Sequence, residues 1–208
     1  MSKNSISHQI TTISQLTSIY DTPGEASIKK EIPYLHPHYQ AIINASPFAV
    51  LATRGLGGLD ASPRGDAAGF VHIEDDKTLI MPDRRGNNRL DSLRNIIHDP
   101  QIALLFLVPG LGETLRVNGR ASISTDPELL NQFIVNGKLP KTVLLIQVET
   151  VFFQCSRAIH RSGLWSDKKD RMVSIPTPGR ILADLSNSTI DGDKYDRELP
   201  ARIKETLY

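Results

Sequence analysis

Short hydrophobic runs, separated by turn residues, recur along the chain and predict a fold dominated by β-strands. Residues 48–53 have the length and composition of a buried strand, and a glycine-rich turn at residues 55–58 follows them. Further strands are predicted over residues 69–73, 78–81, 101–108, 114–124 and 142–155. Few helical patterns lie between these strands, whereas parallel strands need a helical crossover. We therefore expect a mainly β protein, an antiparallel barrel with peripheral helices.

Helical patterns are confined to a few segments. Apolar residues at positions 10, 13, 16 and 19 have helical spacing, and residues 37–44 and 87–98 read as two further helices. Asp126 followed by Pro127 is typical of a helix start, and residues 180–185 indicate a surface helix followed by a tail. This organisation predicts a helical extension over residues 1–32, a barrel domain over residues 33–170, and a C-terminal helix and tail over residues 171–208.

Composition and charge narrow the class of protein. Hydrophobic residues make up 39% and charged residues 23% of the 208 residues, which is a soluble globular balance. The net charge of +1 gives no global attraction for nucleic acid or an anionic membrane, and no run resembles a signal peptide or a membrane span. Cys155 is the single cysteine, which fits the reducing compartment of a cytoplasmic protein. Because it ends an apolar strand with no base beside it, we expect it to be buried and inert. His36 and His38 lack partners that would complete a zinc site, so no metal is expected.

The densest polar cluster covers residues 82–89, PDRRGNNR, between a predicted strand and a predicted helix. Backbone amides at a helix N-terminus favour an anion, and Arg84, Arg85 and Arg89 add donors that match phosphate oxygens. The alternative is a solvated loop in which these arginines pair with nearby carboxylates, namely Asp83, Asp91 or Glu113. The residues alone favour the two interpretations equally.

Three other clusters are individually weak. Residues 62–69 join small residues to Arg64 in a hairpin, which is also what an ordinary glycine-rich turn would contain. Residues 113–120 place Thr114 and Arg116 on one face of a strand, as any solvated strand does. Residues 160–165, HRSGLW, on their own favour a helix end with a packed tryptophan.

Taken together and in this order, the clusters resemble the pyridoxamine 5′-phosphate oxidase-like flavoproteins, which share the FMN-binding split barrel with Greek-key antiparallel topology. The strings that carry the resemblance are SPFAVLATRG, DASPRGD, TLIMPDRRGNNRLDSLRNI, ALLFLVPGLGETLRVNGRA and RSGLW, within residues 33–165. The closest likeness is to a subgroup of probable FMN-dependent enzymes. The resemblance implies a cytoplasmic FMN-dependent oxidoreductase.

The resemblance also implies the roles of individual residues. Arg84, Asn88 and Arg89 would grip the flavin phosphate, and the preceding strand end would line the ribityl chain. Arg64 and Gly65 would run beside the isoalloxazine ring, and a late segment would close the site, often from a second subunit. The full implied set of cofactor-binding residues is Arg64, Gly65, Met81, Pro82, Asp83, Arg84, Asn88, Arg89, Thr114, Arg161, Ser162 and Trp165.

The implied assembly is a homodimer with FMN at the interface, acting on a small redox substrate with NAD(P)H as one candidate. Arg64 or Arg116 are candidates for a cation beside the flavin ring, and no catalytic acid or base is identified. Residues 176–208 lack the arginine–histidine arrangement with which vitamin B6 oxidases grip their substrate, so the substrate stays open. Alternatives are a non-catalytic flavin-binding or flavin-sensing protein, or the same barrel holding F420 or haem, with His72, His98 and His160 as available haem ligands.

Overall fold

The computed structural model describes residues 8–166 and 175–208, and seven strands within them form one antiparallel sheet. The order across the sheet is β2-β1-β5-β6-β7-β4-β3. The strands are β1 (Phe48–Gly55), β2 (Gly58–Gly65), β3 (His72–Ile73), β4 (Thr78–Asp83), β5 (Gln101–Leu107), β6 (Thr114–Ser124) and β7 (Thr142–Gln154). Every ladder between them is antiparallel, so the expected fold class is confirmed.

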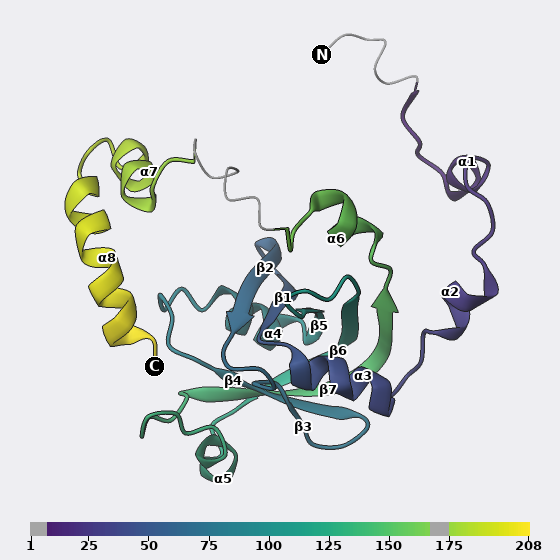
Figure 1. Ribbon diagram of the computed structural model, residues 1–208, viewed down its shortest axis with the longest axis horizontal. Helices are drawn as coiled ribbons and strands as arrows, with labels where there is room; N and C mark the ends of the chain where they lie inside the picture. The colour runs from purple at the N-terminus through teal and green to yellow at the C-terminus, as the bar shows by residue number, and fades with distance from the viewer. Residues whose placement is uncertain (1–7, 167–174) are drawn as a thin grey trace.

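The described residues also form helices outside this sheet. They are α1 (Ile13–Thr17), α2 (Glu25–Lys29), α3 (Pro37–Ala45), α4 (Asp91–His98), α5 (Pro127–Asn131), α6 (Arg157–Ser162), α7 (Pro178–Leu185) and α8 (Gly192–Thr206). Helices α3 and α4 pack on the sheet, whereas α1 and α2 extend away from it and α7 pairs with α8 on the other side (Figure 1). None of the described helices has the length and apolar character needed to cross a membrane.

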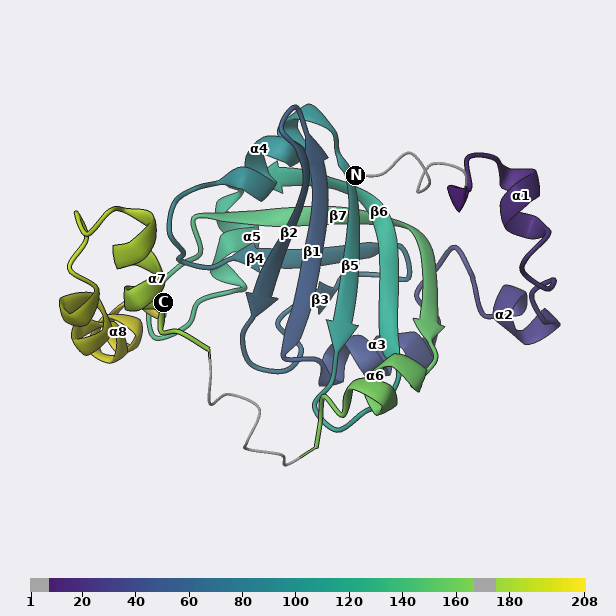
Figure 2. The same ribbon diagram turned by 90° about the horizontal axis from the view of Figure 1, so that it is seen from above.

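The topology is a Greek key. Strands β5, β6 and β7 are consecutive neighbours, while β4, which precedes α4 and β5 in the chain, lies on the far side of β7. Figure 2 shows β2, β1, β5 and β6 side by side, with β7 and β4 crossing behind them. Strands β2 and β3 end the sheet and no ladder joins them, so the barrel remains split on that side.

Strands β1, β4, β5, β6 and β7 contribute buried side chains to a single hydrophobic core. On β1, Ala49, Leu51 and Thr53 are buried and their neighbours are more exposed, as expected for a strand with one face inside. Strand β5 repeats this two-residue alternation. Helices α3 and α4 add Ile43 and Ile96 to the same core. This core holds β4 through Leu79 and Met81, and β2 is held by its ladder with β1, so the two strands that border the candidate site are both fixed in place.

Strands β6 and β7 come close together at Gly119. The ladder shifts register between Asn118 and Gly119, which marks a β-bulge. A Cβ atom on Gly119 would lie 2.2 Å from the backbone oxygen of Gln147, so only glycine fits there without moving the two strands apart.

Several boundaries expected from the sequence are wrong. The helix expected from residue 87 begins at Asp91, because Asn88 and Leu90 have left-handed backbone angles (φ 59° and 61°) that a right-handed helix does not allow. The strand expected over residues 69–73 is only His72–Ile73, since Gly69 turns with φ 81°. The residues after 185, expected to be a tail, contain α8.

The domain boundaries expected from the sequence lie near the two ends of the chain. Of the apolar residues at positions 10, 13, 16 and 19, the second and third lie in the five-residue α1 and the other two flank it, and all four side chains are exposed. The expected boundary at residues 170 and 171 lies outside the described residues. The division into extension, barrel and C-terminal segment therefore stays a prediction.

Candidate functional site

A pocket of about 1170 Å³ lies between β2 and the segment that joins β4 to α4. Its lining comes from residues 60–65, residues 82–93, residues 138–142, Phe70 and Tyr208. The structure brings together seven of the twelve residues expected at a cofactor site, namely Arg64, Gly65, Pro82, Asp83, Arg84, Asn88 and Arg89. The volume suits an organic ligand of cofactor size.

An ion pair spans the pocket between two strands that share no hydrogen-bonded ladder. Arg64 Nη1 on β2 lies 2.7 Å from Asp83 Oδ1 on β4, and the two side chains are only 19% and 16% exposed. The contact holds β2 beside β4 across the split of the barrel. It also directs Arg64 into the pocket.

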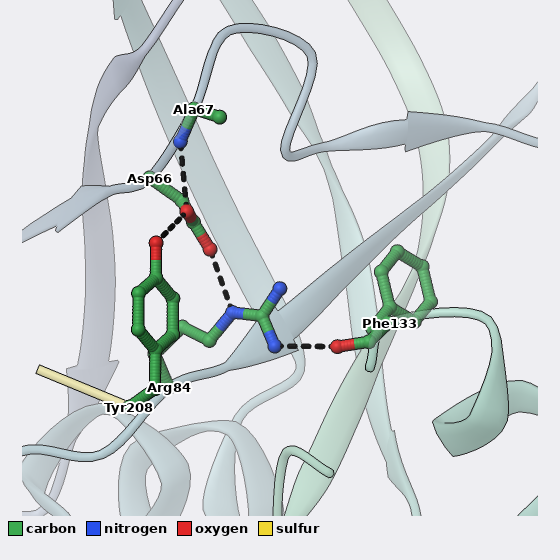
Figure 3. Close-up of polar contacts among 5 residues, drawn as sticks. All are labelled: Asp66, Ala67, Arg84, Phe133 and Tyr208. Atoms are coloured by element: carbon green, nitrogen blue, oxygen red, sulfur yellow. Dashed lines mark hydrogen bonds and ion pairs between the residues drawn. The ribbon is translucent and has the colours of Figure 1, made fainter. Parts of the chain in front are cut away.

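A second ion pair lies beside the first. Arg84 Nε donates to Asp66 Oδ2 at 2.7 Å, and Arg84 Nη1 donates to the backbone oxygen of Phe133 at 2.6 Å (Figure 3). Asp66 Oδ1 accepts hydrogen bonds from the Ala67 amide at 2.8 Å and from the Tyr208 hydroxyl at 2.7 Å. Within the described residues, Arg84 Nη2 makes no hydrogen bond, and Arg84 lines the pocket.

This network shifts the pKa values of two of its members. Burial on its own would raise the pKa of Asp66, but hydrogen bonds from Tyr208, Ala67 and Arg84 outweigh it and hold that pKa below its ordinary value. The hydrogen bond to Asp66, followed by desolvation, raises the pKa of the Tyr208 phenol. Asp66 is therefore a carboxylate and Tyr208 a neutral donor at neutral pH.

The loop before α4 differs from the expected helix N-terminus. Because α4 begins at Asp91, the arginines precede it instead of occupying its first turn. Arg89 Nε bonds to Asp91 Oδ2 at 2.8 Å, a contact that raises the pKa of the guanidinium. Arg85 is exposed at the pocket rim and forms no salt bridge within the described residues. Arg89 therefore forms the ion pair expected for a solvated loop, and it also lines the pocket together with Arg84 and Arg85.

The pocket lining has an excess of positive charge. It contains six cationic residues and three carboxylates, a difference of three, on a chain whose net charge is +1. The cationic residues are Arg64, Arg84, Arg85, Arg89, Lys138 and Lys141, and the acidic residues are Asp60, Asp83 and Asp91. Arg64 Nε and Thr142 Oγ1 in the same lining are buried without a hydrogen-bond partner among the described residues. Both features are typical of an anion-binding site.

The other five expected residues lie outside the pocket of this single chain. Met81 is buried at 1% exposure in the core, and Thr114 on β6 donates to Gln154 Oε1 at 3.2 Å. Arg161 and Ser162 belong to α6, and Trp165 Nε1 donates to the backbone oxygen of Leu111 at 2.7 Å.

The structure also tests what the sequence predicted for Arg116 and Cys155. Arg116 does not line the pocket; its guanidinium lies 4.3 Å from the ring centre of Phe152. Cys155 is exposed, so the expectation that it is buried was wrong: β7 ends at Gln154, and the next residue begins the turn to α6. In residues 8–166 and 175–208, no group of three or more His, Cys, Asp or Glu residues is placed to hold a metal ion.

The sequence did not indicate several residues of this site, among them Asp66, Lys138, Thr142 and Tyr208. Asp66 belongs to the DASPRGD string, but nothing in that string indicates that Asp66 pairs with Arg84. Lys138 lies in the segment before β7 and Thr142 is the first residue of that strand, and neither belongs to a motif. The contact between Tyr208 and Asp66 joins residues 142 positions apart, and no local pattern signals it.

Residues 35–155 match the family model described as pyridoxamine 5′-phosphate oxidase. The match covers 121 of 208 residues, all seven strands and both ion pairs of the pocket. The chain belongs to the pyridoxamine 5′-phosphate oxidase family. Membership confirms the resemblance seen in the sequence, and Tyr208 lies outside the matched region.

Solved structures with a similar fold include bacterial proteins of low sequence identity. HupZ from Group A Streptococcus is 23% identical over 58% of this chain and 94% of its own, with a TM-score of 0.49. General Stress Protein 26 from Bacillus anthracis str. Sterne is 20% identical over 55% and 88%, with a TM-score of 0.42. A FAD-binding protein from Mesorhizobium loti is 15% identical over 56% and 89%, with a TM-score of 0.41. No curated protein matches the chain.

Proposed function

We propose that this chain is an FMN-dependent oxidoreductase whose cofactor lies in the pocket between β2 and the β4–α4 segment. The observation that carries the proposal is the excess of positive charge in the pocket lining, which is still two when Asp66, the partner of Arg84, is counted with the three lining carboxylates. Such an excess attracts an anionic ligand, and FMN carries a phosphate. The lining lies almost entirely within the family region, and the family resemblance implies flavin binding.

The residues of the pocket fit the groups of FMN. The buried Arg64 Nε and Thr142 Oγ1 lack protein partners, and a ligand with oxygen atoms along its length would satisfy both. Apolar residues, among them Phe70, Leu93 and Leu139, provide surfaces for a planar ring. A volume of about 1170 Å³ accommodates one such molecule.

In this proposal the phosphate is held by Arg84, Asn88 and Arg89. Arg84 Nη2 faces no hydrogen-bond acceptor among the described residues, and guanidinium groups match phosphate oxygens geometrically. Pro82 and Asp83 lie along the ribityl chain, above Met81 in the core. Arg64 and Gly65 lie beside the ring.

A second copy of the chain supplies the remaining residues. Thr114, Arg161, Ser162 and Trp165 do not line the pocket of one chain, yet the family resemblance implies that they contact the flavin. In a homodimer with two FMN sites at its interface, these residues of one chain would contact the flavin held in the pocket of the other. The indole of Trp165, 37% exposed, gives such an interface an aromatic surface.

FMN, when bound, would exchange electrons and hydride with a small organic substrate, with NAD(P)H as the candidate reductant, in the cytoplasm. The chain would bind the cofactor, orient it and exclude water from it. Arg64 would place a fixed positive charge beside the ring, held in position by Asp83. We assign no residue as a general acid or base.

The first test is the absorption spectrum of the purified protein, followed by FMN titration of two double variants. Arg84→Ala/Arg89→Ala removes the phosphate donors and should abolish FMN retention. Arg54→Ala/Arg180→Ala is the matched control, since it removes the same charge from two arginines that also pair with carboxylates outside the pocket. Stoichiometric FMN in the first double variant would show that the phosphate lies elsewhere.

Anaerobic addition of NADH or NADPH tests the reaction. Bleaching of the flavin absorbance, followed by its recovery with an added acceptor, is the expected result. A flavin spectrum that no reductant changes would instead support a non-catalytic flavin-binding protein. A deazaflavin or haem spectrum would replace FMN as the cofactor.

A further inference from the structure

Tyr208, two residues beyond α8, lies in the lining of the pocket although it is outside the family region. Its hydroxyl donates to Asp66, and its ring centre lies 5.6 Å from the guanidinium carbon of Arg84 (Figure 3). Its backbone oxygen accepts a hydrogen bond of 2.9 Å from Lys138 Nζ. Three separate contacts thus place this residue over the cationic end of the pocket.

The two helices that carry Tyr208 form a tightly joined hairpin. A Cβ atom on Gly179 of α7 would lie 2.1 Å from the backbone oxygen of Gly192 at the start of α8, so the two helices meet backbone to backbone. Asp196 Oδ1 accepts a hydrogen bond of 2.7 Å from the Gly179 amide, and Asp196 Oδ2 accepts one from Thr177. The hairpin can therefore move as one body.

The hairpin packs mainly on itself. Helix α8 packs against α7, and both helices stand beside the sheet in Figure 1. Tyr208 brings the end of α8 to the pocket through a few polar contacts and one face of an aromatic ring. A link of this kind breaks at low cost compared with a packed helix interface.

We propose that Tyr208 is a latch that competes with the anionic group of the ligand for Arg84, so that ligand binding releases the α7–α8 hairpin. The inference rests on the proposed function, because the anion in question is the FMN phosphate. With the latch closed, Tyr208 covers one face of the Arg84 guanidinium and Asp66 occupies its Nε.

The competition follows from charge. Asp66 is a carboxylate whose side chain is 5% exposed, and it is held within 2.7 Å of Arg84. A phosphate arriving at Arg84 would face this carboxylate at short range, which is unfavourable for two anions away from water. A phosphate bound at Arg84 Nη2 would repel Asp66 from the guanidinium, and Tyr208, hydrogen-bonded to Asp66, would then lose its position over Arg84.

The latch is tested with Tyr208→Ala and Tyr208→Phe, and with Tyr20→Ala, an exposed tyrosine outside the pocket, as the matched control. FMN association is followed by stopped-flow fluorescence. We expect association with Tyr208→Ala to be about tenfold faster than with the wild type, the factor that one charge-assisted hydrogen bond contributes. Tyr208→Phe should lie between the two, and Tyr20→Ala should equal the wild type.

Hydrogen exchange of residues 192–206 gives a second readout that does not depend on flavin chemistry. Exchange should be faster in Tyr208→Ala than in the wild type, and FMN should raise it in the wild type only. An unchanged association rate, or slower exchange on FMN binding, overturns the latch.

The same experiment separates failure of the latch from failure of the proposed function. If neither the wild type nor Tyr208→Ala binds FMN, the flavin proposal fails. Inorganic phosphate is then the probe: the latch stands if phosphate raises the exchange of α8 in the wild type but not in Tyr208→Ala. It falls if phosphate leaves that exchange unchanged.

Discussion

Arg64 on β2 and Asp83 on β4 lie 2.7 Å apart although four strands separate β2 from β4 in the hydrogen-bonded order of the sheet. Backbone pairing therefore does not join these two strands at the split of the barrel. Side chains do, through this pair and through Arg84 and Asp66 next to it. The candidate site thus lies where two ion pairs join the strands at the split of the barrel. A ligand that contacts these arginines would therefore also affect the stability of the fold.

Removing one partner of the Arg64–Asp83 pair should destabilise the fold. Asp83→Ala leaves Arg64 buried without its carboxylate, and we expect the free energy of unfolding to fall by about 1–3 kcal/mol. Urea denaturation measures it. Arg54→Ala serves as the control, since Arg54 is 64% exposed and its pairing with Asp99 should matter little. Equal losses in the two variants would mean that the pair across the split contributes no more than a surface contact.

The stability supplied by Asp66 should depend on pH with a defined sign. The pKa of Asp66 is lowered in the folded protein, so its contribution is present above the unfolded carboxyl pKa of about 4 and is lost as pH falls through the folded value. The difference in unfolding free energy between the wild type and Asp66→Asn should therefore be constant above about pH 5 and shrink below it. Urea denaturation at a series of pH values tests this, and a difference that grows on acidification would contradict it.

Tyr208 should show the opposite dependence. Its pKa is raised by Asp66, so its contribution is present below the unfolded phenol pKa of about 10 and is lost as pH rises through the folded value. The phenol therefore does not titrate near neutral pH. After correction for the pH dependence of intrinsic exchange rates, the protection of α8 from hydrogen exchange should change with pH near 7 no more in the wild type than in Tyr208→Phe. Extra protection that disappears near pH 7 would indicate another titrating group in the contact.

Gly119 is the position where substitution should harm the sheet most clearly. In Gly119→Ala the new Cβ would meet the backbone of Gln147 and Val148, which cannot rotate away, so β6 and β7 must separate at the bulge. We expect a loss of about 2 kcal/mol or more in urea denaturation. Gly57→Ala is the matched control because nothing lies within 4 Å of its Cβ position. A loss no larger than that of Gly57→Ala would show that the strands adjust freely.

The sequence was sufficient for the local features of the fold. Short hydrophobic runs bounded by turn residues located β1 and β5, and in the structure both strands alternate between buried and more exposed residues. Asp126 caps α5 as expected, accepting a hydrogen bond from the Glu128 amide. The two segments that carry Arg64 and Arg84 were identified by their small and basic residues, and the structure places both segments on one pocket.

Long-range relationships escaped the sequence for physical reasons. The Arg64–Asp83 pair depends on the curvature of the whole sheet, and no short motif encodes curvature. The left-handed conformations of Asn88 and Leu90 delayed the start of α4, because a leucine at positive φ follows from tertiary context and not from propensity. Tyr208 reaches Asp66 from the far end of the chain, so only folding reveals that they meet.

The last prediction concerns the proposed contribution of a second chain. Trp165 is the single tryptophan, and it does not line the pocket of its own chain. In Trp165→Phe the pocket is intact but the fluorophore is absent, whereas Arg84→Ala/Arg89→Ala keeps the fluorophore and should lose FMN. Neither homodimer should show quenching of tryptophan fluorescence by FMN.

Mixed dimers of these two variants should recover the quenching. One of their sites combines the intact arginines of one chain with Trp165 of the other, so any loss of tryptophan emission on adding FMN must cross the interface. Mixing Trp165→Phe with wild-type chains controls for exchange of subunits. Size-exclusion chromatography with differently tagged chains establishes that mixed dimers form. If they form and FMN still leaves the tryptophan emission unchanged, the flavin of one chain does not lie near Trp165 of the other, and the assignment of Arg161, Ser162 and Trp165 to the partner's site must be abandoned.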